Sequence, residues 1–235
     1  YKRQNIAFVG CSRWLSGRAK KSYLLRGKAV LSIPNPIDTK VYHPMDQGMA
    51  RELLGLPSGK RLLLFGALNV TDKRKGIDYL IEALRRMEKQ DVELVVFGQV
   101  KDDIRGLFPV PIHSMGYLSD ESKIVALYNA VDMFITSSLE ENLPNTIMES
   151  MACGTPCVGF EIGGIPEMID HRVNGYVANY KDAGDLANGI QWVLEHEDRL
   201  ALSDACVKKV QENYTEEVVA KQYTCLLYTS PSPRD

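Results

Sequence analysis

The stretch "MFITSSLEENLPNTIMESMACGTPCVGF" (133–160) decides the fold, because a strand, a helix and a second strand follow one another in it. Residues 133–138 begin as an apolar run and end in polar residues, and residues 156–160 form another short run, so both are predicted as buried strands. Pro144 suits the first turn of a helix, where its missing N–H costs nothing. The buried face of that helix is expected to consist of four residues: Ile147, Met148, Met151 and Ala152.

The same alternation of strands and helices continues along the chain. Further strands are predicted at 61–67, 91–98 and 110–116. Helices are predicted at 75–87, 119–132 with Ser119 as N-cap, within "GGIPEMI" (163–169), and at 182–195 and 203–223. This order predicts an α/β fold with a mostly parallel, Rossmann-like sheet and helices on both faces.

The two ends of the chain differ from this pattern. Residues 1–34 predict a small βαβ piece that is too short to bury its own core, followed by the proline-containing connector "PNPIDTKVYHP" (34–44). We therefore expect 1–34 to be the end of a preceding domain and 35–224 to be the main domain. The last residues, 225–235, resemble translated sequencing-adapter read-through, so we expect a non-native tail there.

The composition restricts the class of protein. With 45% hydrophobic residues, 25% charged residues and a net charge of −2, the chain resembles soluble globular proteins, and no nucleic-acid partner is expected. It contains no apolar run long enough to span a membrane and opens with no secretory signal. Its five scattered cysteines favour reduced thiols in the cytoplasm. Cys153 and Cys157 lack a second ligand pair, so no metal site is predicted.

Three polar loops follow predicted strands, at the edge where open parallel sheets bind ligands. In the first loop, "GALNVTDKRKG" (66–76), Lys73, Arg74 and Lys75 precede a helix, where they favour phosphate. A solvated basic turn explains the same residues equally well. In the third loop, Gly163 and Gly164 permit a close backbone approach or a simple turn.

The second loop, "LEENLPNTIMES" (139–150), carries two carboxylates eight residues apart, Glu141 and Glu149. Asn145 and Glu149 share a helical face, and the free amides of 142–145 open toward the same space. Acceptors on both sides of a group of donors suit a nucleotide sugar. On spacing alone, a helix-terminal Glu141 and a solvated Glu149 remain the simpler interpretation.

Several motifs in order resemble one family. They are the E-x7-E of Glu141 and Glu149, "SMACGTPCVGFEIGGIPEMIDHRVNGYVA", "KRKGIDYLIEAL", "RELLGLP", "GYL" at 116–118 and the connector "SIPNPIDTKVYHP". From about residue 6 to 223 the chain resembles the donor half of a family-4 retaining glycosyltransferase of GT-B fold.

The resemblance implies roles for individual residues. Glu141 would bind hydroxyls of the donor sugar, Lys75 would neutralise the diphosphate, and Glu149 would accept hydrogen bonds from the ribose. Many members carry Gly-Arg where this chain has Gly66-Ala67, so Lys73 or Arg74 would have to supply the second cation. The resemblance implies that Glu141 and Lys75 are the catalytic residues. It places donor binding on eight further residues: Glu149, Asn142, Leu143, Pro144, Asn145, Arg74, Gly66 and Tyr117.

The resemblance also implies the reaction and its partners. We expect a retaining hexosyltransferase that uses a UDP- or GDP-linked sugar, needs no metal or cofactor, and acts in polysaccharide or glycolipid synthesis. The acceptor, a glycan or a lipid-linked molecule, would bind a preceding domain, so this chain alone should be inactive. The expected location is the cytoplasm, with possible contact with the inner membrane face. The alternatives are a degenerate sugar-nucleotide module and a nucleotide-sugar 2-epimerase.

Overall fold

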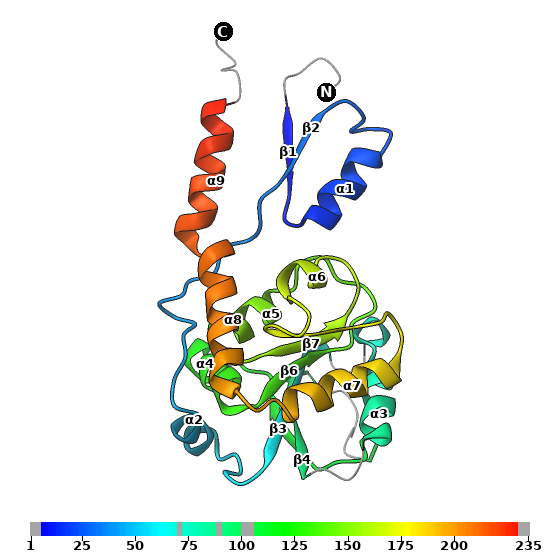
Figure 1. The fold of residues 1–235 in the computed structure, drawn as a ribbon, viewed down its shortest axis with the longest axis vertical. Helices are drawn as coiled ribbons and strands as arrows, with labels where there is room; N and C mark the ends of the chain where they lie inside the picture. Colours follow the sequence, from blue (N-terminus) through cyan, green and yellow to red (C-terminus); the bar gives the residue numbers. More distant parts are fainter. Residues whose placement is uncertain (1–5, 70–71, 88–90, 100–105, 230–235) are drawn as a thin grey trace.

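The computed structural model describes residues 6–69, 72–87, 91–99 and 106–229 (Figure 1). Its strands are β1 (Ala7–Gly10), β2 (Ala29–Ser32), β3 (Arg61–Asn69), β4 (Val92–Gln99), β5 (Ile112–Gly116), β6 (Met133–Thr136), β7 (Cys157–Phe160) and β8 (Gly175–Ala178). Its helices are α1 (Arg13–Lys21), α2 (Gln47–Leu54), α3 (Ile77–Arg86), α4 (Glu121–Ala130), α5 (Asn145–Ala152), α6 (Ile165–Met168), α7 (Ala183–Leu194), α8 (Arg199–Asn213) and α9 (Glu216–Thr229), with a short 3-10 helix η1 (Lys73–Lys75).

The main body is a six-stranded sheet in the order β5-β4-β3-β6-β7-β8, and every described pairing in it is parallel. Residues 62–65 of β3 and all residues of β6 and β7 are buried, because helices cover both faces of the sheet. One core cluster includes residues of α2, α4, α5, α6 and α8, and the other includes residues of α3 and α7. This confirms the predicted α/β fold with helices on both sides (Figure 1).

Several element boundaries differ from the sequence predictions. Asp120, not Ser119, caps α4, because its carboxylate accepts a hydrogen bond from the backbone N–H of Ser122 at 3.0 Å. The predicted helix 203–223 is two helices, α8 and α9, separated at Tyr214, whose carbonyl accepts from the N–H of Ile37 at 2.8 Å. Helix α9 continues to Thr229, while 230–235 of the expected tail lie outside the described residues.

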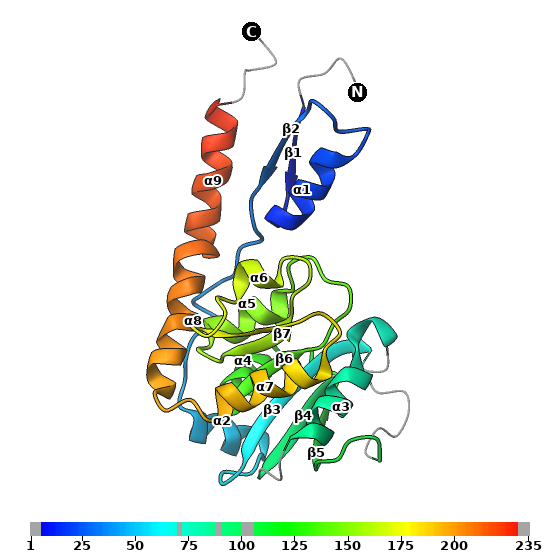
Figure 2. The ribbon, with the colours of Figure 1, turned by 45° about the vertical axis from the view of Figure 1, so that its right-hand side comes forward.

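The elements β1, α1 and β2 form a separate unit with its own two-stranded parallel sheet. In both views α9 runs beside this unit and α8 runs beside the main body (Figures 1 and 2). None of the described helices combines the length with the apolar character that a membrane span requires.

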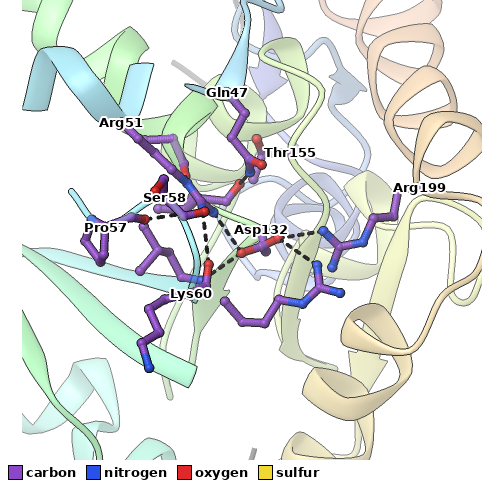
Figure 3. A network of polar contacts seen from close by, with 12 residues as sticks. Gln47, Arg51, Pro57, Ser58, Lys60, Asp132, Thr155 and Arg199 are labelled. Carbon is purple, nitrogen blue, oxygen red and sulfur yellow. Dashed lines mark hydrogen bonds and ion pairs between the residues drawn. The ribbon is translucent and has the colours of Figure 1, made fainter. Parts of the chain in front are cut away.

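A charged network stabilises the amino-terminal edge of the main sheet (Figure 3). The carboxylate of Asp132, just before β6, accepts hydrogen bonds from the guanidinium groups of Arg51 (3.1 Å) and Arg199 (2.6 Å) and from the N–H of Leu62 (2.7 Å). Arg61 contributes a longer ion pair at 3.4 Å. One buried carboxylate thus joins α2, β3, β6 and α8 at the edge opposite the loops of the predicted donor site.

Candidate functional site

Most of the predicted site residues lie in the segments that follow β3 and β6, which are neighbours in the sheet, while Gly66 lies within β3 and Tyr117 follows β5. Hydrogen bonds to two backbone carbonyls join the loops after β3 and β6: the N–H of Leu139 donates to the carbonyl of Arg74 at 2.7 Å, and the hydroxyl of Ser137 donates to the carbonyl of Lys75 at 2.9 Å. Gly76, between η1 and α3, has a φ of 62°, and a Cβ there would collide with the Ser137 carbonyl. The close approach of the two loops therefore requires glycine at this position.

The structure brings together the two residues that were predicted to be catalytic. Nζ of Lys75 lies 2.5 Å from Oε1 of Glu141, although 66 residues separate them in the chain. The side chains are 32% and 15% exposed, so the pair is partly accessible to solvent. A lysine and a glutamate in this position can contact the phosphate and the hydroxyl groups, respectively, of one ligand.

The other two basic residues of the first loop do not join this pair. The guanidinium of Arg74 donates to both carboxylate oxygens of Asp72, with the shortest distance 2.7 Å, and it is largely exposed. This hydrogen bonding holds the pKa of Asp72 below its ordinary value. Lys73 is exposed. Among these three basic residues, Lys75 is the one whose side chain forms an ion pair with a described residue of the second loop.

Glu149 lies on α5 and is partly buried. Its Oε2 accepts a hydrogen bond from the hydroxyl of Tyr128 at 2.8 Å. Burial raises the pKa of Glu149, the charge of Glu121 raises it further, and the hydrogen bond from Tyr128 opposes both effects. The interpretation of Glu149 as a solvated side chain is therefore wrong.

The segment between the two glutamates makes contacts that the sequence did not reveal. Pro144 is the N-cap of α5 rather than part of its first turn, Leu143 is buried and Asn145 is exposed. The side chain of Asn142 accepts from the hydroxyl of Ser12 at 2.6 Å and donates to Sγ of Cys11 at 2.8 Å. The side chain of Asn142 thus contacts the β1–α1–β2 unit.

A second contact fixes that unit to the main body. The carboxylate of Glu167 on α6 accepts from the backbone N–H groups of Arg13 and Trp14, both at 2.8 Å. These are N–H groups of the first turn of α1, which need an acceptor outside their own helix. Residues 154 positions apart make this contact, and no periodicity in the sequence indicates it.

Gly66 and Tyr117 are the two remaining predicted site residues. Gly66 belongs to β3, and the ring of Phe97 occupies the space that a side chain would need. Tyr117 follows β5, the outermost strand on that side, and is well exposed. In the described ranges, no hydrogen bond or ion pair connects either residue with Lys75 or Glu141, and those ranges contain no cluster of three or more metal-ligating side chains.

Comparison with known proteins identifies the family. Residues 59–196 match the family model "Glycosyl transferases group 1". The N-acetyl-alpha-D-glucosaminyl L-malate synthase of Bacillus anthracis is 25% identical over 207 residues, which cover 86% of this chain and 54% of that protein. The chain spans about half the length of the curated relatives it matches.

Solved structures share the fold. Sucrose-phosphate synthase from Thermosynechococcus elongatus superimposes with a TM-score of 0.79 at 22% identity, over 94% of this chain and 57% of that one. Anabaena HepE, solved in complex with UDP and glucose, gives a TM-score of 0.76 at 19% identity over 95% of this chain and 63% of that one. These neighbours are GT-B glycosyltransferases, so the fold is of GT-B type. With more than half of its residues matching the family model, the chain is a member of the glycosyl transferases group 1 family.

Proposed function

We propose that this chain is the donor-binding part of a retaining glycosyltransferase that moves a sugar from a nucleotide diphosphate to a glycan or lipid-linked acceptor. The observation that carries the proposal is the contact between Lys75 and Glu141, with Glu149 on the helix that follows Glu141. Relatives and neighbours are consistent with it, since HepE was solved with UDP and with UDP-glucose.

In this proposal each residue contributes one interaction with the donor. Lys75 faces the diphosphate and stabilises the charge that develops on the leaving nucleoside diphosphate. Glu141 accepts hydrogen bonds from hydroxyls of the sugar. The free N–H groups at the start of α5 and the positive end of its helix dipole favour the phosphates. Glu149 accepts hydrogen bonds from the ribose.

Other parts of the proposal extend beyond the donor site. Residues 6–34 would be the end of the acceptor-binding domain, which would contact the donor domain through Asn142 and Glu167. Arg74, Gly66 and Tyr117 would border the donor without touching Lys75. The donor would be UDP- or GDP-linked and need no metal, and the product would be a polysaccharide or glycolipid made at the cytoplasmic side of the membrane. Neither the 2-epimerase nor the degenerate module is favoured by an observation.

Calorimetric titration of the 235-residue chain with UDP, GDP, UMP and GMP tests the donor site. We expect one diphosphate to bind more tightly than its monophosphate, and Lys75→Met to abolish that difference while the monophosphate still binds. Lys60→Met is the matched control, because Lys60 forms an ion pair with Asp91 next to the amino-terminal ends of β3 and β4. Absence of diphosphate binding, or equal losses for both nucleotides in Lys75→Met, would refute the proposal.

A further inference from the structure

Tyr128 is a buried polar side chain that contacts Glu149 of the proposed donor site. It is fully buried, and its ring makes edge-to-face contacts with Phe97 (centroids 6.2 Å apart, 83°) and Phe134 (6.0 Å, 82°). Its backbone carbonyl accepts from the hydroxyl of Thr155 at 2.7 Å. Such packing leaves the ring a single orientation, because rotation would open voids or create overlaps in a close-packed core.

The hydroxyl of this fixed ring ends on Glu149. It donates to Oε2 at 2.8 Å, and burial followed by the charge of Glu149 raises the pKa of Tyr128 well above its ordinary value. The phenol therefore keeps its proton and remains a donor to the carboxylate. Hydrogen bonds to charged groups are stronger and more directional than neutral ones.

The second oxygen of Glu149 is left available. Within the described part of the chain, Oε1 accepts no hydrogen bond, and it is not among the fully buried polar atoms that lack a partner. The other titratable groups that interact with this carboxylate are Glu121 on α4, Tyr42 in the connector and Cys153 at the end of α5. Among them Glu121 is also an anion, and repulsion from it opposes ionisation of Glu149.

We propose that Tyr128 is a positioning residue that holds Oε2 of Glu149, so that Oε1 faces the ribose of the donor and distinguishes ribose from a sugar lacking those hydroxyls. A carboxylate on a flexible side chain loses entropy when it binds a hydroxyl, and the bond from Tyr128 removes most of that cost before the ligand arrives. This inference rests on the proposed donor site.

The test compares UDP with 2′,3′-dideoxy-UDP by calorimetry, using the wild-type chain, Tyr128→Phe and Tyr176→Phe. Tyr176 is a matched control, because it is also buried and donates to a carboxylate, that of Asp185, at 2.8 Å on the other side of the sheet. We expect the wild type and Tyr176→Phe to prefer UDP by roughly 10- to 100-fold, the range for hydrogen bonds to a charged group. In Tyr128→Phe the preference for UDP should fall below about threefold, which corresponds to a loss of at least half of the binding free-energy difference between the two ligands.

The outcomes distinguish failure of the proposed donor site from failure of the positioning role of Tyr128. If the wild type binds neither UDP nor GDP, the proposed function itself is wrong. If the wild type selects GDP, the same comparison is made with GDP and 2′,3′-dideoxy-GDP in place of the two uridine nucleotides. If the wild type discriminates and Tyr128→Phe discriminates equally well, the positioning role is wrong. Equal weakening of both ligands in Tyr128→Phe would show a purely structural role. If Tyr128→Phe does not fold, 3-fluorotyrosine at position 128 replaces it, because this residue keeps the shape of tyrosine and has a more acidic phenol. An unchanged preference for UDP over 2′,3′-dideoxy-UDP would then overturn the inference.

Discussion

Removal of the Asp132 carboxylate tests how the amino-terminal edge of the sheet is stabilised. The side chain of Asp132 is 2% exposed, and its partner Arg51 is 7% exposed. Asp132→Ala would leave the Arg51 guanidinium buried without its counter-charge, although carbonyl oxygens such as those of Ala130 and Ser58 would still accept from it. An unpaired buried charge is costly because it has lost both water and its partner.

The expected magnitude follows from the burial of each pair. Loss of one partner of a buried ion pair destabilises a protein by about 3–5 kcal/mol. Arg61 and Arg199 are 47% and 40% exposed, and exposed pairs of this kind contribute less than about 1 kcal/mol each. We therefore expect Asp132→Ala to lower the free energy of unfolding by about 3–5 kcal/mol, and Arg199→Ala to lower it by less than about 1 kcal/mol.

Denaturation in urea, followed by circular dichroism, measures both values. The matched control is Asp91→Ala, because the Asp91 carboxylate pairs with Lys60 but is 72% exposed, and its loss should cost less than about 1 kcal/mol. The slope of the free energy against urea concentration should stay constant if the native state remains compact. A loss in Asp132→Ala no larger than in Arg199→Ala would refute the assignment of the stabilisation to the Arg51 pair.

Three further substitutions test other contacts. Glu149→Gln should weaken nucleotide binding and hardly change stability at pH 8. Burial raises the pKa of Glu149 in the folded state. The wild type should therefore gain stability relative to this variant at a pH below 4.5, the ordinary pKa, and lose that gain as the pH rises through the raised pKa. Thermal unfolding between pH 4 and 8 measures this, and a constant difference would contradict it. Glu167→Ala should speed hydrogen exchange of the Arg13 and Trp14 amides by roughly 2- to 30-fold, the equivalent of a lost N-cap, and unchanged rates would show that the contact is not formed. Glu141→Gln should leave Lys75 without its ion pair and raise the affinity for diphosphate but not for nucleoside. Equal diphosphate affinities of the wild type and Glu141→Gln would exclude competition between Glu141 and phosphate for Lys75.

The sequence predicted those features that follow from a local pattern. The apolar runs of β3, β4, β6 and β7 identified buried strands, and the rule that ligands bind beyond the carboxyl ends of parallel strands brought Lys75 and Glu141 to one edge. Strand β8 was missed, because it is four residues long and begins with Gly175, a residue that usually weakens strands.

Contacts between distant segments were not predictable in this way. The hydrogen bond between Tyr128 and Glu149 depends on how α4 packs against α5, and the contact of Glu167 with α1 depends on how two separate sheets are oriented. Neither packing angle is encoded in a residue spacing. The solvated interpretation of Glu149 failed for this reason, since its burial comes from a neighbouring helix.

The pairing of the basic residues in the first loop has a consequence for the rate at which a ligand arrives. Lys75 is paired with Glu141 and Arg74 with Asp72, and the remaining cation, Lys73, is balanced in number by Glu140, so the described loop cluster presents little net positive field to an approaching anion. Electrostatic steering requires an unbalanced charge that acts over about one Debye length, roughly 8 Å at physiological salt. A phosphate group would therefore reach this edge by unguided diffusion, and its attraction to Lys75 would begin only when it displaces Glu141. The association rate should consequently vary little with ionic strength, while the dissociation rate carries the difference between ligands.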